Sequence, residues 1–192
     1  CSYSDGTWIL NPIWAKTGIE CYYGQAPHLF LSMSDYDAKH FWEHLIQDCM
    51  DVHVPNSEWK VQTSGVAEGI LIGGYARNFA LILGNKYFPW SREEKYILFI
   101  EDHESFGGVD YYSAMLTHVE QDEFMEHVAG VIVGNYSDEE HPELLARLKR
   151  MGERFQIPVV YCDDFGHGQN HAILPIGRRV KLDTEAKKLY YL

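Results

Sequence analysis

Four titratable side chains lie close together in the stretch VVYCDDFGHGQNHAILPIG, residues 159–177. Asp163, Asp164, His167 and His171 directly follow an apolar run, and a glycine stands on each side of His167. Glycines allow a sharp backbone turn, so the His167 imidazole can face a cleft. Because histidine titrates near neutrality, it is the usual base that activates a serine hydroxyl. The stretch could therefore position a catalytic base, hold a metal, or form a polar turn.

Two further polar clusters supply the partners that such a base needs. Ser4, in the sequence YSDG, precedes a predicted helix, where its hydroxyl can be exposed and the next backbone N–H groups can face an oxyanion. The structural alternative is a helix N-cap, because Ser and Asp are favoured there. Glu101 ends the apolar run in LFIEDHES, where a partly enclosed carboxylate could orient an imidazole. Its structural alternative is a solvated strand exit.

A metal site is the competing interpretation of the histidine stretch. His167 and His171 are four residues apart, and Asp163, Asp164 and Glu101 could add oxygen ligands. That spacing brings two imidazoles to one face only in a helix, and the glycines of this stretch disfavour a helix. We therefore prefer the catalytic interpretation.

The composition restricts the class of protein. The chain has 192 residues, of which 46% are hydrophobic, so it can bury a substantial core. Its formal net charge of -12 argues against nucleic acid or an anionic membrane surface as a partner. No apolar run approaches the roughly 20 residues of a membrane helix, so we expect a soluble protein. The four scattered cysteines favour free thiols in a reducing compartment.

The N-terminal third predicts two helices and a strand. Trp8, Ile9, Ile13 and Trp14 have the spacing of a short buried helix that ends at Gly18, and a strand follows over residues 19–23. Residues 34–50 predict a second helix. We expect Asp35 or Asp37 to cap this helix. Its shared face should be formed by Phe41, Leu45 and Cys49.

The remainder of the chain predicts an α/β unit. Residues 51–69 contain proline, asparagine, serine and glycine, which indicates a linking segment and an internal boundary. Strand and helix patterns alternate through residues 96–162, with Pro142 opening the last helix, and this is typical of a partly parallel sheet. Residues 172–183 and 187–192 have strand-like patterns.

The clusters, in this order, resemble the serine LD-carboxypeptidases, including the microcin C immunity peptidases. SYSDGTWILNPIWAKTGIECYYG is similar to that family's nucleophile segment, and EGILIGGYARNFALILGNKYFP to its glycine-rich segment. KYILFIEDHES and IPVVYCDDFGHGQNHAILPIGRRVKLD are similar to the strands that carry its carboxylate and its histidine. The resemblance implies Ser4 as nucleophile, Glu101 as carboxylate, His167 as general base and the Asp5 N–H as an oxyanion donor.

The resemblance also implies the substrate and the setting. The family cleaves an amide near a free carboxyl terminus, either the terminal D-alanine of a murein tetrapeptide or an aminoacyl-nucleotide amide. It works in the bacterial cytoplasm without a cofactor or metal, and a homodimer is expected. We assign substrate binding to Gly73, Gly74 and Asn78, although the usual GGNL reads GGYARNF here. Trp59 could offer a stacking surface for a base or could be a buried tryptophan.

Family members carry an N-terminal α/β domain of roughly a hundred residues before the nucleophile. We therefore expect an α/β fold in which the family's C-terminal domain, a mixed sheet with flanking helices, is preceded only by the tail of that domain. Residues 1–50 would be this remnant, 51–69 the linker, and 70–192 the C-terminal domain. The sequence is either part of a longer protein or a truncated homologue, and in the second case Ser4 would lie at a frayed terminus.

Three alternatives to the serine peptidase remain open. The chain could be a non-catalytic binding module, which predicts that Ser4 lies far from His167. It could be a metal hydrolase that uses His167 and His171. Cys1 could act as a nucleophile with its own amine as base, although nothing else in the chain supports this.

Overall fold

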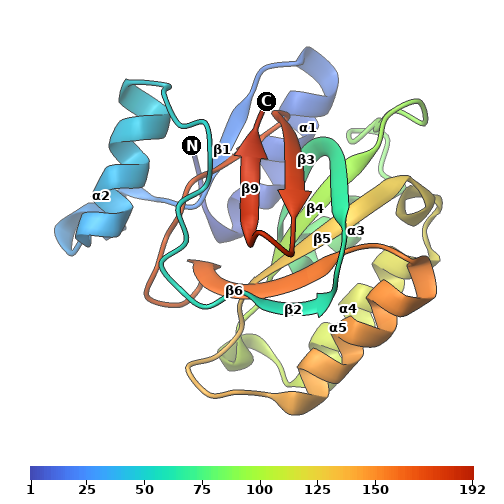
Figure 1. Ribbon diagram of the computed structural model, residues 1–192. Coiled ribbons are helices and arrows are strands. Elements are labelled where there is room, and N and C mark those ends of the chain that lie inside the picture. The colour runs from blue at the N-terminus through green and yellow to red at the C-terminus, as the bar shows by residue number, and fades with distance from the viewer.

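A seven-stranded mixed sheet forms the centre of the protein, described here from a computed structural model of residues 1–192 (Figure 1). The strand order is β2-β6-β5-β4-β3-β8-β9. The four middle strands are parallel, and the outer three pair antiparallel to their neighbours. The strands are β2 (Lys60–Thr63), β3 (Val66–Tyr75), β4 (Tyr96–Glu101), β5 (Val128–Asn135), β6 (Val159–Gly166), β8 (Arg179–Asp183) and β9 (Lys188–Tyr191).

The parallel strands are connected by helices, as the alternating pattern predicts. The helices α3 (Ala76–Ile82), α4 (Val109–Gln121) and α5 (Pro142–Phe155) follow β3, β4 and β5 in turn. Figure 1 shows α4 and α5 packed side by side, with α2 (Asp35–Phe41) on the opposite side of the molecule. Every residue of β4 is buried, which is expected for a strand covered on both faces. The predicted α/β fold with a mixed sheet is thus confirmed.

The helix after Ser4 has the predicted limits but a different buried face. This helix is α1 (Thr7–Thr17). It is followed by Gly18, whose φ of 71° is the left-handed conformation common after helices. Trp8, Ile9 and Ile13, which we expected in the core, are exposed. The buried residues are Thr7, Leu10 and Asn11.

The reason lies in the backbone of β3. The Asn11 amide donates to Gly73 O at 2.8 Å and accepts from Gly73 N–H at 3.2 Å, and Thr7 Oγ1 accepts from Tyr75 N–H at 2.9 Å. Polar side chains therefore face the sheet because they satisfy strand groups that would otherwise be unpaired. Hydrophobic periodicity alone predicts the wrong face.

The second predicted helix divides into α2 and a short π-helical segment, Trp42–Ile46. Its N-cap is Ser34, whose Oγ accepts from Asp37 N–H at 3.1 Å, and not Asp35 or Asp37. The predicted face is also wrong, since Cys49 is exposed, and the buried side chains are those of Asp37, His40 and His44. Asp37 and His40 are buried against residues 171–173, near His167. His44 instead packs against the rings of Tyr22 and Tyr191.

A second, two-stranded sheet pairs β1 (Cys21–Tyr23) with β7 (Leu174–Ile176). It joins the first segment of the chain to the segment that follows His167. The predicted linking segment, residues 51–69, includes β2 and the beginning of β3, so only residues 51–59 and 64–65 lie outside strands of the central sheet. The boundary that we expect at residues 51–69 stays a proposal. No helix has the length and apolar character needed to cross a membrane.

Candidate active site

Ser4 occupies a strained turn between a strand-like segment and a helix. Ser2 forms a parallel bridge with Tyr23, and α1 begins at Thr7. Between them, Ser4 has a φ of 53°, which is uncommon for residues other than glycine and is found at functional sites. Gly6 permits this tight turn, because a Cβ there would lie 2.2 Å from Ser2 Oγ. The turn presents the hydroxyl of a half-buried serine at the helix start.

The side chain of His167 bridges Ser4 and Glu101. Its Nε2 lies 3.0 Å from Ser4 Oγ, and its Nδ1 lies 2.8 Å from Glu101 Oε2. Since the carboxylate can only accept when ionised, Nδ1–H donates to Glu101 and Nε2 is left to accept from the serine hydroxyl. Glu101 is fully buried, whereas the side chain of His167 is 13% exposed. The three groups thus have the mutual geometry of a nucleophile, a base and an orienting carboxylate.

The topology explains how these distant residues meet. Glu101 is the last residue of β4, and His167 directly follows β6. Because β4, β5 and β6 are parallel, their carboxyl ends lie at one edge of the sheet, where ligand sites of α/β folds collect. Gly168 packs closely on Asn135 at the end of β5, where a Cβ would lie 2.5 Å from Asn135 Cγ. This close approach fixes the backbone of the histidine loop.

Tyr23 is a site residue that the sequence reasoning missed. Its hydroxyl donates to Glu101 Oε1 and accepts from Ser4 N–H at 3.2 Å. Burial, followed by the charge of Glu101, raises the pKa of Tyr23 well above its ordinary value, so the phenol keeps its proton. It therefore links the carboxylate to the backbone of the serine. Its position at the end of the predicted strand 19–23, near Ser4 in sequence, was the available signal.

Three aromatic rings surround the imidazole of His167. The ring centroids of Tyr3, Phe106 and Tyr75 lie 4.7, 4.9 and 5.4 Å from its own. These rings limit the movement of His167 and reduce the access of water to it. In a less hydrated site, the hydrogen bonds of the imidazole are stronger than in water.

The loop that carries His167 is anchored by Asp164. This carboxylate is fully buried and accepts four hydrogen bonds of 2.7–2.9 Å. The donors are His53 Nε2, Asn56 N–H, Ser57 Oγ and Trp59 Nε1. Burial alone would raise the pKa of Asp164, but the hydrogen bond and the charge of His53 and the bonds from Trp59 and Ser57 lower it. Trp59 is only 2% exposed, so it offers no stacking surface for a base.

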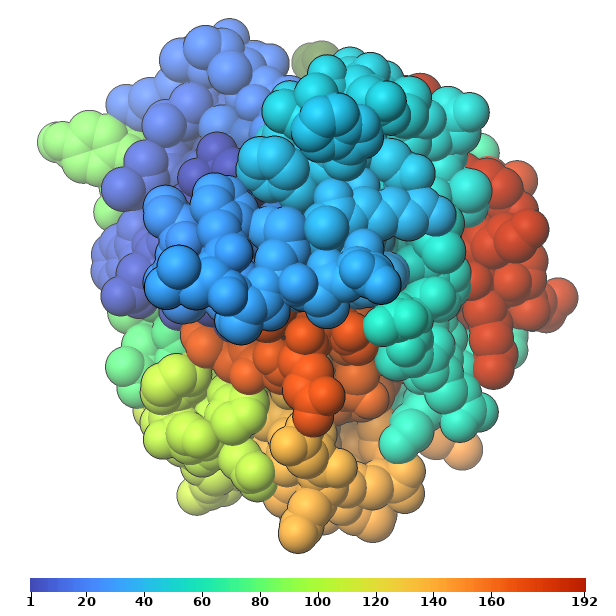
Figure 2. Space-filling model, turned by 90° about the vertical axis from the view of Figure 1, so that its left-hand side faces the viewer, coloured from blue at the N-terminus to red at the C-terminus, as the bar shows by residue number.

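A second anchor comes from α2. Asp37 Oδ1 accepts from His171 N–H at 2.7 Å, Asp37 Oδ2 lies 3.3 Å from His171 Nδ1, and the His40 ring accepts from Ile173 N–H at 3.3 Å. Figure 2 shows the segment around residues 27–48, blue to cyan, covering part of the orange segment that follows β6. No local pattern indicates these partners, since they lie more than a hundred residues apart in the chain.

The side chains proposed as metal ligands point to separate partners. His167 contacts Glu101, and His171 contacts Asp37. Asp163 accepts hydrogen bonds from Asn135 and Tyr161. Asp164 accepts the four hydrogen bonds that anchor the histidine loop. No group of three or more His, Cys, Asp or Glu side chains is arranged to hold a metal ion. The geometry gives the metal interpretation no support.

The predicted substrate residues contact the segment that follows Ser4. Gly74 has a φ of 136°, and a Cβ there would lie 2.3 Å from Thr7 Oγ1, so glycine lets β3 approach the start of α1. Gly73 bonds to Asn11, as described above. The amide of Asn78 is buried and donates to Asp5 Oδ1 at 2.9 Å, which ties α3 to the residue after Ser4. Whether these residues contact a substrate stays a prediction, as does the Asp5 N–H as an oxyanion donor.

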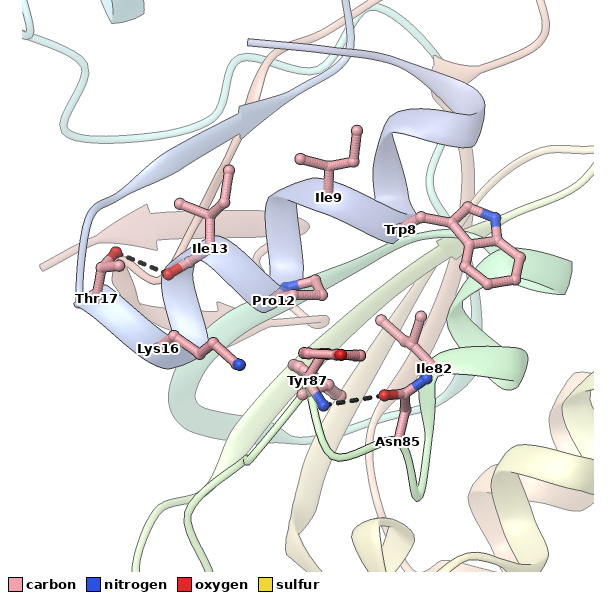
Figure 3. A pocket seen from close by; sticks show the side chains of 10 residues that line it. Trp8, Ile9, Pro12, Ile13, Lys16, Thr17, Ile82, Asn85 and Tyr87 are labelled. Carbon is pink, nitrogen blue, oxygen red and sulfur yellow. Dashed lines mark hydrogen bonds between the residues drawn. The ribbon is translucent and has the colours of Figure 1, made fainter.

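A groove of about 490 Å³ lies along the exposed face of α1, away from the three bridged residues, none of which lines it. Figure 3 shows Pro12 and Lys16 of α1 facing Tyr87, with Trp8 and Ile82 at one end of the groove. The groove has no cluster of titratable groups, whereas Ser4, His167 and Glu101 form one.

Comparisons with known proteins show the family to which the chain is related. The family model described as the LD-carboxypeptidase C-terminal domain matches residues 68–182. The "Putative carboxypeptidase slr1534" of Synechocystis is 31% identical over 200 residues, covering 99% of this chain and 62% of its own. The "Putative carboxypeptidase" of Treponema pallidum is 27% identical, covering 97% and 62%. The chain thus spans less than two thirds of the length of these relatives.

Solved structures show the same fold. The MccF-like protein of Bacillus anthracis superimposes with a TM-score of 0.83 at 22% identity, over 100% of this chain and 67% of its own. The muramoyltetrapeptide carboxypeptidase of Oxalobacter formigenes gives 0.78 at 23% identity, over 99% and 66%. The likeness to these structures shows the fold, and the family model defines the class of protein. The chain belongs to the LD-carboxypeptidase family.

Proposed function

We propose that the protein is a serine peptidase that hydrolyses the amide bond next to a C-terminal residue, with Ser4, His167 and Glu101 as its catalytic triad. The observation that carries this proposal is the position of His167 within hydrogen-bonding distance of both Ser4 and Glu101. Family membership supports the same chemistry. The 3.0 Å between Ser4 and His167 argues against a binding module in which these residues are far apart.

The proposed reaction follows from the hydrogen bonds. As Ser4 Oγ attacks the carbonyl carbon, His167 Nε2 takes the hydroxyl proton, and the bond between carbon and amide nitrogen then breaks as Nε2 returns this proton to the leaving amine. Water completes hydrolysis of the acyl-serine by the same proton transfers. Glu101 stabilises the imidazolium and fixes its tautomer, and Tyr23 orients Glu101 through its second oxygen. The Asp5 N–H supplies one oxyanion donor.

For the substrate, we propose a peptide with an L,D bond before its terminal residue. The second candidate is an aminoacyl-nucleotide, because similar structures include MccF in complex with glutamyl sulfamoyl guanosine and an MccF-like protein with AMP. The burial of Trp59 supports the peptide, since the tryptophan that we had considered for stacking a base is inaccessible. The proposed setting is the bacterial cytoplasm, in keeping with four free cysteines. Light scattering would test the homodimer.

The test compares turnover in variants of the full chain. We expect three variants, Ser4→Ala, His167→Ala and Glu101→Gln, to keep the circular dichroism spectrum of the unmodified protein. Each should lose about 10³-fold or more in kcat on an L,D-peptide. Ser32→Ala changes an exposed serine outside the site and is the matched control. Hydrolysis that survives Ser4→Ala would rule out the proposal, and inhibition by a chelator would favour a metal hydrolase instead.

A further inference from the structure

Arg77 carries a positive charge that no carboxylate of the protein neutralises. The chain has 28 acidic residues and seven arginines. Five of these arginines have a carboxylate oxygen within 4.0 Å, namely Arg92, Arg147, Arg154, Arg178 and Arg179. Arg77 and Arg150 have none. In so acidic a protein, an unpaired arginine next to the proposed active site calls for a functional explanation.

The side chain of Arg77 is held in a defined position. Its Nε donates to the hydroxyl of Tyr111 at 2.7 Å, and its guanidinium carbon lies 5.1 Å from the centroid of the same ring. These contacts use one edge and one face of the guanidinium. The two Nη groups make no hydrogen bond to the protein, so they remain available as a pair of parallel donors. A fixed guanidinium loses less conformational entropy when it binds a planar anion.

The neighbours of Arg77 place it at the edge of the proposed active site. Tyr75, two residues earlier, pairs with Glu101 in the sheet, and its ring contacts that of His167. Asn78, the next residue, donates to Asp5. On the other side, Tyr111 packs against Gly107, where a Cβ would lie 2.8 Å from its ring.

The charge of Arg77 acts on the carboxylate beside Glu101. Burial raises the pKa of Asp102 to about 6, and Arg77 is among the charges that oppose this rise. Asp102 does not neutralise Arg77, because no ion pair joins them, and its buried Oδ2 has no hydrogen-bond partner. The positive charge of Arg77 therefore acts on groups of the proposed active site, while Arg77 itself remains available to bind an anion from solution.

We infer that Arg77 binds the free carboxylate of the substrate's C-terminal residue. This inference rests on the proposed function, since a peptidase that removes a terminal residue must distinguish a free carboxylate from a continuing chain. The two Nη donors match the two oxygens of a carboxylate, and such charge-assisted, bidentate hydrogen bonds are roughly twice as strong as neutral ones. Arg77 would thereby set which bond reaches Ser4, and a peptide amidated at its C-terminus would lose this contact.

The experiment measures binding and turnover separately, with N-acetyl-L-lysyl-D-alanine and its C-terminal carboxamide as probes. Binding is measured by calorimetry in the Ser4→Ala background, so that it does not depend on catalysis. There, Arg77→Gln should weaken binding of the acid roughly 10- to 100-fold and leave binding of the carboxamide within about twofold. Arg77→Lys, which keeps the charge without the paired donors, should give an intermediate loss. Arg150→Gln is the matched control and should change neither ligand.

The outcomes separate this inference from the proposed function. If the protein with Ser4 does not hydrolyse the acid but binds it through Arg77, the proposed function fails and the inference stands. If the acid is hydrolysed but Arg77→Gln affects acid and carboxamide equally, or affects neither, the inference is overturned and the function stands. Failure of the Ser4→Ala protein to bind the acid also overturns the inference.

Discussion

The Nε2 atom of His167 lies 3.0 Å from Ser4 Oγ, although 163 positions of the chain separate the two residues. Two sets of contacts bring these residues together. The turn at Ser4 is fixed by the bridge between Ser2 and β1, and β1 in turn pairs with β7, which follows the histidine loop. Buried carboxylates then anchor that loop on both sides of His167. The geometry of Ser4 and His167 thus depends on residues outside the proposed catalytic triad, and these residues can be tested.

Tyr23→Phe should reduce both stability and activity. The change removes the hydroxyl that donates to Glu101 and accepts from Ser4 N–H, and it leaves a buried carboxylate with one donor fewer. Hydrogen bonds to charged groups contribute about 1.5–3 kcal/mol, so we expect a loss of about 2 kcal/mol in the free energy of unfolding and roughly tenfold in kcat. Urea titration measures the free energy of unfolding, and a peptide assay measures kcat. Tyr87→Phe, at an exposed tyrosine, should change neither.

Asp164→Asn should destabilise the protein strongly. The substitution removes a buried charge that four donors surround and replaces one acceptor oxygen with an NH₂ group that faces donors. Hydrogen bonds to a charged group contribute about 1.5–3 kcal/mol, and a buried donor left unpaired costs about 1–3 kcal/mol, so we expect a loss of about 3 kcal/mol in the free energy of unfolding, measured by urea titration at pH 7. Asp138→Asn, at an exposed aspartate without such bonds, is the control. Equal stability of the two variants would show that Asp164 does not anchor the loop.

The buried histidines of the α2 segment should make the protein sensitive to acid. Burial, followed by neighbouring charges, lowers the pKa of His44 to about 4 and that of His40 to about 2. The unfolded chain binds these protons near pH 6.5, whereas the folded protein does not, so stability is greatest above pH 6.5 and falls as the pH decreases below it. For His44 this amounts to about 2 kcal/mol between pH 7 and pH 5.

His44→Phe tests this directly, because neither nitrogen of His44 has a hydrogen-bond partner to lose. Urea titrations at pH 7 and pH 5 should differ less in this variant than in the unmodified protein, by about 2 kcal/mol. His28→Phe, at an exposed histidine, should keep the full difference. If His44→Phe keeps it too, the acid sensitivity arises elsewhere.

The sequence predicts the order of elements from residue 70 onward because each strand and helix there is locally periodic and covered on its expected face. It also predicts that Ser4, Glu101 and His167 stand at element ends, where parallel strands collect polar groups. It fails to predict the buried faces of α1 and α2, since both helices bury polar side chains that bond to a strand or loop far along the chain. Asn11 with Gly73, and Asp37 with His171, are such pairs, and no local pattern encodes them.

Gly74→Ala should move α1 and with it Ser4. An alanine Cβ would lie 2.3 Å from Thr7 Oγ1, the atom that donates to Ser4 O at 2.8 Å and accepts from Tyr75 N–H. Gly84→Ala is the matched control, because Gly84 also has a positive φ, 72°, but nothing lies within 4 Å of its Cβ position. Backbone strain alone should cost the control about 1 kcal/mol of stability with activity retained.

In Gly74→Ala, overpacking adds about 1–3 kcal/mol to that strain, and the displaced turn should lower kcat by roughly 10²-fold, since a misplacement of about 1 Å at a catalytic group has this effect. Urea titration and the peptide assay compare the two variants. Only Gly74 contacts the helix start, and its φ of 136° is less accessible to an alanine than the 72° of Gly84. The difference between the variants therefore reports the packing of α1 on β3 together with this added strain. Equal kcat in the two would mean that Ser4 is positioned independently of β3, and that the bridge to β1 suffices.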